Sequence, residues 1–68
     1  MPKYYVNKKA QSTGEHEIHT SDCAHKPLTE NSLYLGEFSN CREAVSKAQV
    51  YYDNVDGCYY CCNKCHTK

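Results

Sequence analysis

Six cysteines in a chain of 68 residues constrain the fold more than any other feature of this sequence. Four of them lie in the run GCYYCCNKCH, from Gly57 to His66, as two adjoining C-x-x-C units, Cys58–Cys61 and Cys62–Cys65. Thiols at such short spacing hold a metal ion, form disulfides or carry out redox chemistry. The function of the chain depends mainly on which of these three uses applies.

The chain is short enough that we expect a single small domain, residues 1–68. A domain of this size buries only roughly 60% of the surface that its unfolded chain exposes. Such a scaffold usually needs a staple, either disulfides or a metal. The need is greater here because, apart from Tyr and Cys, the large apolar residues are few: Met1, Val6, Ile18, Leu28, Leu33, Leu35, Phe38, Val45, Val50 and Val55.

Charge and hydropathy narrow the function classes. Eight Lys and Arg residues balance eight Asp and Glu residues, whereas a dedicated nucleic-acid binder is usually basic. The chain shows no signal-peptide pattern and no membrane-spanning stretch, so we expect a cytoplasmic protein with no membrane partner. Cytosolic thiols stay reduced, which favours a metal over disulfides. A mature secreted form would reverse this argument, since six cysteines can make a disulfide framework.

Secondary-structure patterns indicate an α+β domain with a short β-sheet, one helix and a C-terminal cysteine-rich knuckle. Aromatic and β-branched residues predict strands at Lys3–Val6, Glu15–Thr20 and Leu33–Phe38, with Gly36 as a bulge in the third. A helix is expected over about 41–53, and the cysteine-rich knuckle follows it. The expected order is therefore three strands, one helix and the knuckle.

The helix has the clearest signals of any element. Asn40 and Glu43 form a capping-box pattern at its start. Asn54 and the Asp56–Gly57 pair predict a turn after its end. Between these signals, apolar residues recur at helical spacing on one stripe: Cys41, Ala44, Val45, Ala48, Tyr51 and Tyr52.

Two short-spaced pairs of Cys and His residues that are distant in sequence are typical of a structural zinc site. Cys58 and Cys61 make one such pair. The other comes from HTSDC, which places His19 and Cys23 four residues apart. A structural zinc contributes about 10–16 kcal/mol of apparent binding energy, against about 2–4 kcal/mol for a disulfide. We therefore predict one structural Zn²⁺, with no catalytic residues and no evident small-molecule substrate.

The fourth ligand is open from the residues alone. If the segment after Cys61 forms a helical turn, Cys65 points the same way as Cys61 and replaces His19. In that arrangement Cys62 points away from the site. Cys62 and His66 also stay open as ligands.

Other uses of the cysteines and tyrosines have weaker support. A thioredoxin-like C-x-x-C sits beside a βαβ pattern, and no strand is expected after this one. A hydrolytic zinc site needs an open coordination position and a general base, whereas we expect this site to be closed and structural. Cys41 is expected to be a small buried apolar residue. The alternative is a reactive thiolate, because a helix N-terminus lowers the pKa of a thiol. The three Tyr-Tyr pairs are expected to thicken the core, with base stacking as the alternative.

The pieces HTSDC, ENSLYLGEF, SNCREAVSKA and DGCYYC together resemble the zinc-binding domain of the Ada DNA-repair methyltransferase family. The chain also looks similar to short bacterial proteins that end in GCYYC…CH. The resemblance implies a metal role for His19, Cys23 and two terminal cysteines, either Cys58–Cys61 or Cys62–Cys65. It departs from the family at its first ligand, because a histidine cannot serve as the thiolate methyl acceptor.

The sequence thus predicts a structural-zinc binding or adaptor module with DNA or protein as its partner, and not an enzyme. The candidate metal ligands are His19, Cys23, Cys58, Cys61 and Cys65. Two alternatives remain. One is a zinc-activated reactive-thiol protein, either a methyl acceptor or a thiol sensor, and the other is a disulfide-stapled secreted domain.

Overall fold

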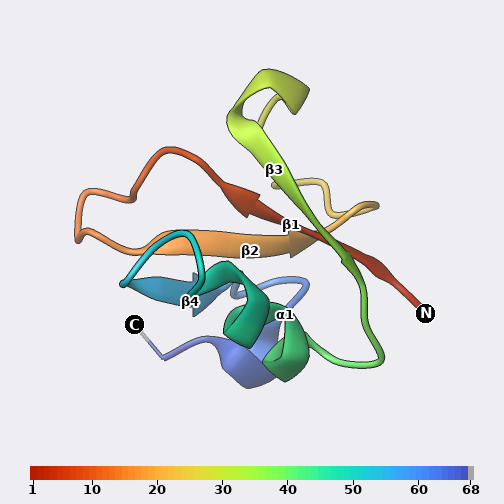
Figure 1. Cartoon of the computed structure of the whole chain (residues 1–68). Helices are drawn as coiled ribbons and strands as arrows, with labels where there is room; N and C mark the ends of the chain where they lie inside the picture. Colours follow the sequence, from red (N-terminus) through yellow and green to blue (C-terminus); the bar gives the residue numbers. More distant parts are fainter. Residues whose placement is uncertain (68) are drawn as a thin grey trace.

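The computed structural model describes residues 1–67 and shows an α+β fold, with one α-helix packed on a four-stranded mixed sheet (Figure 1). This confirms the predicted fold class. The elements in chain order are β1 (Lys3–Asn7), β2 (His16–Thr20), the 3-10 helix η1 (Thr29–Asn31), β3 (Ser32–Glu37), α1 (Cys41–Ala48), β4 (Val55–Gly57) and the 3-10 helix η2 (Asn63–Cys65).

The sheet has the order β3-β1-β2-β4, so the first two strands lie at its centre. β1 pairs antiparallel with both β2 and β3, whereas β4 pairs parallel with β2. The sequence prediction missed β4 and read Asp56–Gly57 as a turn. The two residues instead pair with Glu17 and Ile18 of β2. A three-residue strand that contains Asp and Gly carries no strand signal, because both residue types are depleted in strands.

A bulge in β3 confirms the expectation for Gly36. Tyr4 of β1 lies opposite Gly36, but the next residue, Tyr5, lies opposite Tyr34, so Leu35 is an extra residue in the ladder. Gly36 has φ +128°, a backbone conformation that only glycine adopts readily. The bulge leaves the Leu35 side chain buried in the core.

The N-terminus of α1 is capped as predicted. The Asn40 side chain accepts a hydrogen bond from the Glu43 amide at 3.0 Å. Glu43 reaches back one residue further than expected, because its Oε1 accepts from the amide and hydroxyl of Ser39. The predicted end of the helix at about residue 53 was wrong, because α1 ends at Ala48. After Ala48 the chain tightens into turns in which the Tyr51 amide donates to the Ala48 carbonyl.

The hydrophobic core lies between α1 and one face of the sheet (Figure 1). The helix contacts all four strands and η2. Its two alanines let it approach closely, and Val6 and Ile18, which face each other across β1 and β2, are completely buried. The buried cluster comprises Tyr4, Val6, Ile18, Leu35, Ala44, Ala48 and Cys62.

The tyrosine pairs do not all serve the core. Tyr4 is buried, which agrees with the expectation for the first pair. Tyr59 and Tyr60 are 57% and 68% exposed, so the expectation was wrong for the last pair. Tyr51 is also exposed, whereas its neighbour Tyr52 is half-buried and stacks on His16. Within residues 1–67, no helix has both the length and the apolar character to cross a membrane.

Candidate metal centre

The parallel pairing of β2 and β4 brings the first two site residues together. Ile18 pairs with Gly57, and the Cys58 amide donates to the Ile18 carbonyl at 3.0 Å. His19 and Cys58 each follow one of these paired residues. Because side chains alternate along a strand, they project to the same side, away from the Ile18 side chain. Both are almost fully buried.

A tight turn after β2 folds Cys23 back toward His19. The Cys23 amide donates to the Thr20 carbonyl at 3.2 Å. The Thr20 hydroxyl in turn donates to the Asp22 carboxylate at 2.9 Å. This polar turn explains how residues four apart in HTSDC reach one point.

The knuckle after β4 supplies the remaining residue, Cys61. Its turn is closed by the Cys62 amide, which donates to the Cys58 carbonyl at 2.9 Å. Gly57 allows the close approach, because a Cβ at that position would lie 2.6 Å from the Cys62 carbonyl oxygen and 2.8 Å from the Cys65 Cβ. Contacts this short are not found for real Cβ atoms, so the knuckle in this form requires glycine.

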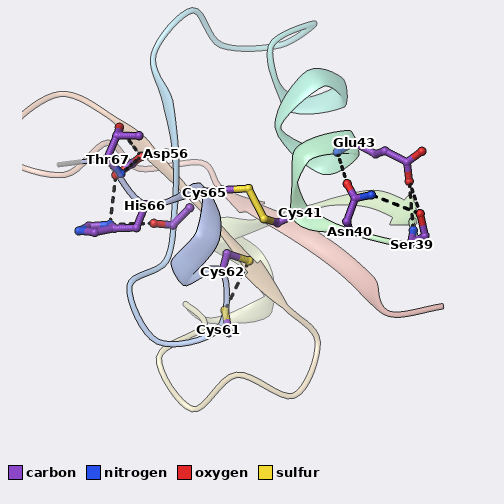
Figure 2. The surroundings of a disulfide bond; sticks show 11 residues. Ser39, Asn40, Cys41, Glu43, Asp56, Cys61, Cys62, Cys65, His66 and Thr67 are labelled. Carbon is purple, nitrogen blue, oxygen red and sulfur yellow. Dashed lines mark hydrogen bonds and ion pairs between the residues drawn. A yellow bond between two sulfur atoms is a disulfide. The ribbon is translucent and has the colours of Figure 1, made fainter.

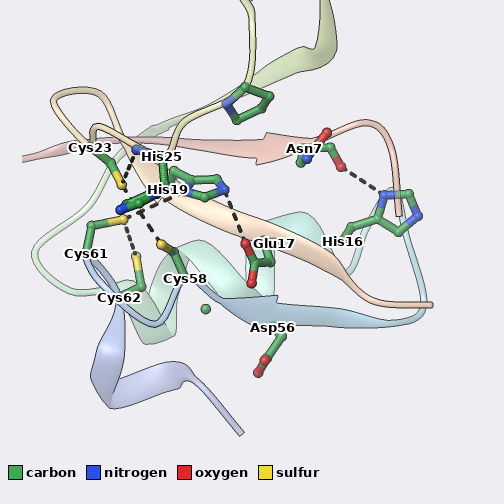
Figure 3. Close-up of polar contacts among 12 residues, drawn as sticks. Asn7, His16, Glu17, His19, Cys23, His25, Asp56, Cys58, Cys61 and Cys62 are labelled. Atoms are coloured by element: carbon green, nitrogen blue, oxygen red, sulfur yellow. Dashed lines mark hydrogen bonds and ion pairs between the residues drawn. The ribbon is translucent and has the colours of Figure 1, made fainter. Parts of the chain in front are cut away.

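The four side chains form one group, in which one ligand atom from each lies within 4.8 Å of all the others. The Cys23 and Cys58 sulfurs are 3.9 Å apart, and the Cys61 sulfur is 4.0 Å from His19 Nδ1 (Figure 3). With Zn–S bonds of about 2.3 Å, a tetrahedral site separates its sulfurs by roughly 3.8 Å. The spacing of the group therefore fits a tetrahedral metal ion of this size.

The His19 ring is oriented between the thiols and a carboxylate. Its Nε2 lies 3.6 Å from Glu17 Oε1, so Nδ1 is the nitrogen that faces the sulfurs (Figure 3). Metal-binding histidines commonly present the second nitrogen to a carboxylate in this way. Burial, with smaller contributions from His25 and Lys26, lowers the pKa of His19 to about 4. The imidazole is thus neutral at neutral pH, as a metal ligand must be.

Backbone amides point at two of the sulfurs. The Thr20 amide donates to Cys61 Sγ at 3.3 Å, and the His25 amide donates to Cys23 Sγ at 3.4 Å. Burial nonetheless raises the pKa of the Cys23 thiol, against the lowering effect of the His25 amide. Hydrogen bonds of this kind stabilise a thiolate, and a bound dication would add the charge that offsets burial.

The fifth predicted ligand, Cys65, lies outside this group. It forms a disulfide with Cys41 that links η2 to the first residue of α1 (Figure 2). The expectation of Cys41 as a small buried apolar residue was therefore wrong, and nothing in the cysteine spacing predicts this pairing. The segment after Cys61 is a 3-10 turn rather than the helical turn that the replacement of His19 by Cys65 would need.

The two other open candidates are placed differently. Cys62 is buried in the core with its sulfur 3.8 Å from the Cys61 sulfur. Burial, and then the neighbouring Cys61, raises the pKa of the Cys62 thiol to about 12. His66 Nδ1 instead lies 3.0 Å from the Gly57 carbonyl oxygen and 3.2 Å from the buried Asp56 carboxylate.

Glu17 lies beside His19, and sequence reasoning assigned it no role in the site. Its signal was its position two residues before His19, which places both side chains on one face of a strand. Comparisons of the chain with protein-family models, curated proteins and solved structures found no match. The interpretation of the site therefore depends on its geometry.

Proposed function

We propose that the protein is a small binding module whose C-terminal knuckle is held to the sheet by one structural zinc ion. The observation that carries the proposal is the group of His19, Cys23, Cys58 and Cys61, whose ligand atoms all lie within 4.8 Å of one another. Three thiolates and one imidazole form a donor set typical of structural zinc sites. Softer donors of this kind disfavour magnesium and calcium.

A closed site supports a structural role over a catalytic one. The protein itself supplies four ligands, and a catalytic zinc keeps one position for water or substrate. The ion would join two segments that are far apart in sequence, namely β2 with the turn after it and the C-terminal knuckle. Binding energy of this kind is folding energy, and this chain has a small core to supplement.

A binding or adaptor module needs a macromolecular partner, and the proposed partner is DNA or a protein. The resemblance to the Ada zinc-binding domain is part of this proposal, and the residues that carry the metal role would be His19, Cys23 and the Cys58–Cys61 pair. A reactive-thiol function at Cys62, outside the four-residue group, has less support, because burial raises the pKa of that thiol to about 12.

Cobalt substitution tests the ligand set. Co²⁺ binds such sites more weakly than Zn²⁺ and reports tetrahedral thiolate ligation through its visible absorption. We expect stoichiometric Co²⁺ binding with sulfur-to-cobalt charge-transfer bands, displaced by one equivalent of Zn²⁺. His19→Ala should alter the d–d spectrum, whereas His25→Ala, which removes an exposed histidine nearby, should not.

An octahedral cobalt spectrum without sulfur bands would refute the proposed site. An unchanged spectrum in His19→Ala would keep the metal but reject this ligand set.

A further inference from the structure

The knuckle that the metal would close carries two exposed aromatic rings. The Tyr60 ring is stacked on the His25 ring with centroids 4.0 Å apart and an interplanar angle of 18°. Tyr59 meets Tyr60 edge-on, with centroids 5.2 Å apart. The Asn63 side-chain amide donates to the Tyr59 carbonyl at 3.1 Å and stabilises the turn that carries both tyrosines. Tyr60 is thus a supported, outward-facing aromatic ring rather than a loose side chain.

Two adjoining hollows lie between this knuckle and the start of α1, with volumes of about 260 and 370 Å³. Tyr60 lines the larger one, and Asn40, Cys41 and Lys64 line both. Together they form a groove, which we call the Tyr60 groove. Its lining residues are Tyr4, Ser39, Asn40, Cys41, Arg42, Tyr60, Cys61, Cys62, Asn63, Lys64 and Cys65.

The Tyr60 groove is positive in a chain whose formal charge is zero. Arg42 and Lys64 are exposed on its rim, and none of its lining residues among the described part of the chain is acidic. The nearest acid on α1, Glu43, has its carboxylate engaged by the Ser39 amide and hydroxyl. The groove therefore offers two cations and two side-chain amides beside an aromatic face.

We propose that the Tyr60 groove binds single-stranded nucleic acid. A base would stack on Tyr60, and Arg42 and Lys64 would contact the neighbouring phosphates. Proteins that bind single strands combine an aromatic platform with cations that follow the backbone. A duplex does not offer the faces of its bases. The inference rests on the proposed function, because the metal closes the turn that carries Tyr60 and anchors Cys23 near His25.

Fluorescence anisotropy with labelled oligonucleotides tests the platform. The probes are an oligothymidylate and an oligouridylate of about 12 nucleotides, within the usual site size of such proteins, and a duplex of mixed sequence. We expect the zinc-loaded protein to bind the single strands more tightly than the duplex at low ionic strength. The DNA and RNA arms show which kind of single strand is preferred.

Tyr60→Ala should weaken single-strand binding about tenfold, because stacking of one base is worth about 1–3 kcal/mol. Tyr60→Phe should keep most of the affinity. Tyr51→Ala is the matched control, since Tyr51 is also exposed and has a lysine, Lys47, above its ring. It should bind like the wild type.

The cations are tested through the salt dependence. Arg42→Gln and Lys64→Gln should each reduce the slope of log affinity against log salt by about 0.7, the value for one phosphate contact on a single strand. Lys47→Gln, on the far part of α1, should leave the slope unchanged.

Three outcomes would overturn the inference: no single-strand binding by the zinc-loaded protein, equal binding of the duplex, or equal losses in Tyr60→Ala and Tyr51→Ala. Metal content measured on the same sample separates the two proposals. If the zinc-loaded protein binds no oligonucleotide, nucleic-acid binding at the Tyr60 groove is refuted, whereas the zinc site is not. If a metal-free protein binds single strands and Tyr60→Ala weakens that binding, the zinc site is refuted, whereas the groove is not.

Discussion

The segment 58–65 meets the rest of the molecule at two places, a candidate metal site on one side and a disulfide on the other. On one side, Cys58 and Cys61 meet His19 and Cys23 of the β2 region. On the other, Cys65 is bonded to Cys41 at the start of α1 (Figure 2). The first needs four groups at tetrahedral spacing, and the second needs only two sulfurs. Cysteines that look equivalent in one run therefore have different surroundings: Cys58 and Cys61 lie in the candidate metal group, Cys65 is in the disulfide, and Cys62 is in neither.

Removing a metal ligand should give the largest effect. A structural zinc is worth about 10–16 kcal/mol of apparent binding energy, which exceeds the stability of most small domains. We expect Cys58→Ser to be largely unfolded by circular dichroism, and a strong chelator to unfold the wild type.

Cys62→Ser is the control for this prediction, because it alters a buried thiol outside the four-residue group. It should lose some stability and still bind one metal per chain. A folded, metal-binding Cys58→Ser protein would contradict the assignment of Cys58.

Breaking the disulfide should have a smaller effect and leave the metal in place. The bond spans 24 residues, which corresponds to about 3 kcal/mol of unfolded-state entropy. The double variant Cys41→Ser/Cys65→Ser should therefore unfold at lower denaturant concentration but bind one metal ion with a wild-type cobalt spectrum. Loss of the metal in this variant would show that metal binding depends on the disulfide.

Gly57→Ala should strain both cross-links together. The new Cβ would meet the Cys62 carbonyl and the Cys65 Cβ, and overpacking of this kind costs about 1–3 kcal/mol. We expect a lower melting temperature and weaker metal binding. Ser46→Ala, on an exposed position of α1, should change neither quantity. An unaffected Gly57→Ala protein would mean that the knuckle does not sit this close to β4.

The smallest effect should come from Glu17, whose carboxylate lies beside His19 of the candidate metal site. Loss of the carboxylate beside a metal-binding histidine typically costs about 10–100-fold in metal affinity. Glu17→Gln should therefore release zinc at a lower concentration of competing chelator. Glu30→Gln, which changes an exposed glutamate in η1, should match the wild type in the same competition.

Sequence reasoning worked where a local pattern has a local cause. The cap at Asn40 and the bulge at Gly36 follow from the hydrogen-bonding and backbone preferences of single residues. The His19–Cys23 and Cys58–Cys61 pairs were also visible from their short spacing, which is the spacing that metal ligands on one turn need; their role as ligands stays a prediction. The structure brings these two pairs together.

The rest depends on contacts between distant segments. β4 has no strand signal of its own and exists because Asp56 and Gly57 pair with β2. The Cys41–Cys65 bond cannot be read from spacing, since disulfide connectivity is not deducible from sequence alone. It also bears on the predicted cytoplasmic location, because disulfides persist mainly in oxidising compartments. That location stays a prediction.

Intact mass, measured on freshly purified protein under native and then denaturing conditions with thiol alkylation, tests the two-cross-link account most directly. We expect one zinc ion per chain that is lost on denaturation, four alkylated thiols, and one remaining disulfide that reductant opens. A metal-free chain whose six cysteines are paired in three disulfides would contradict it.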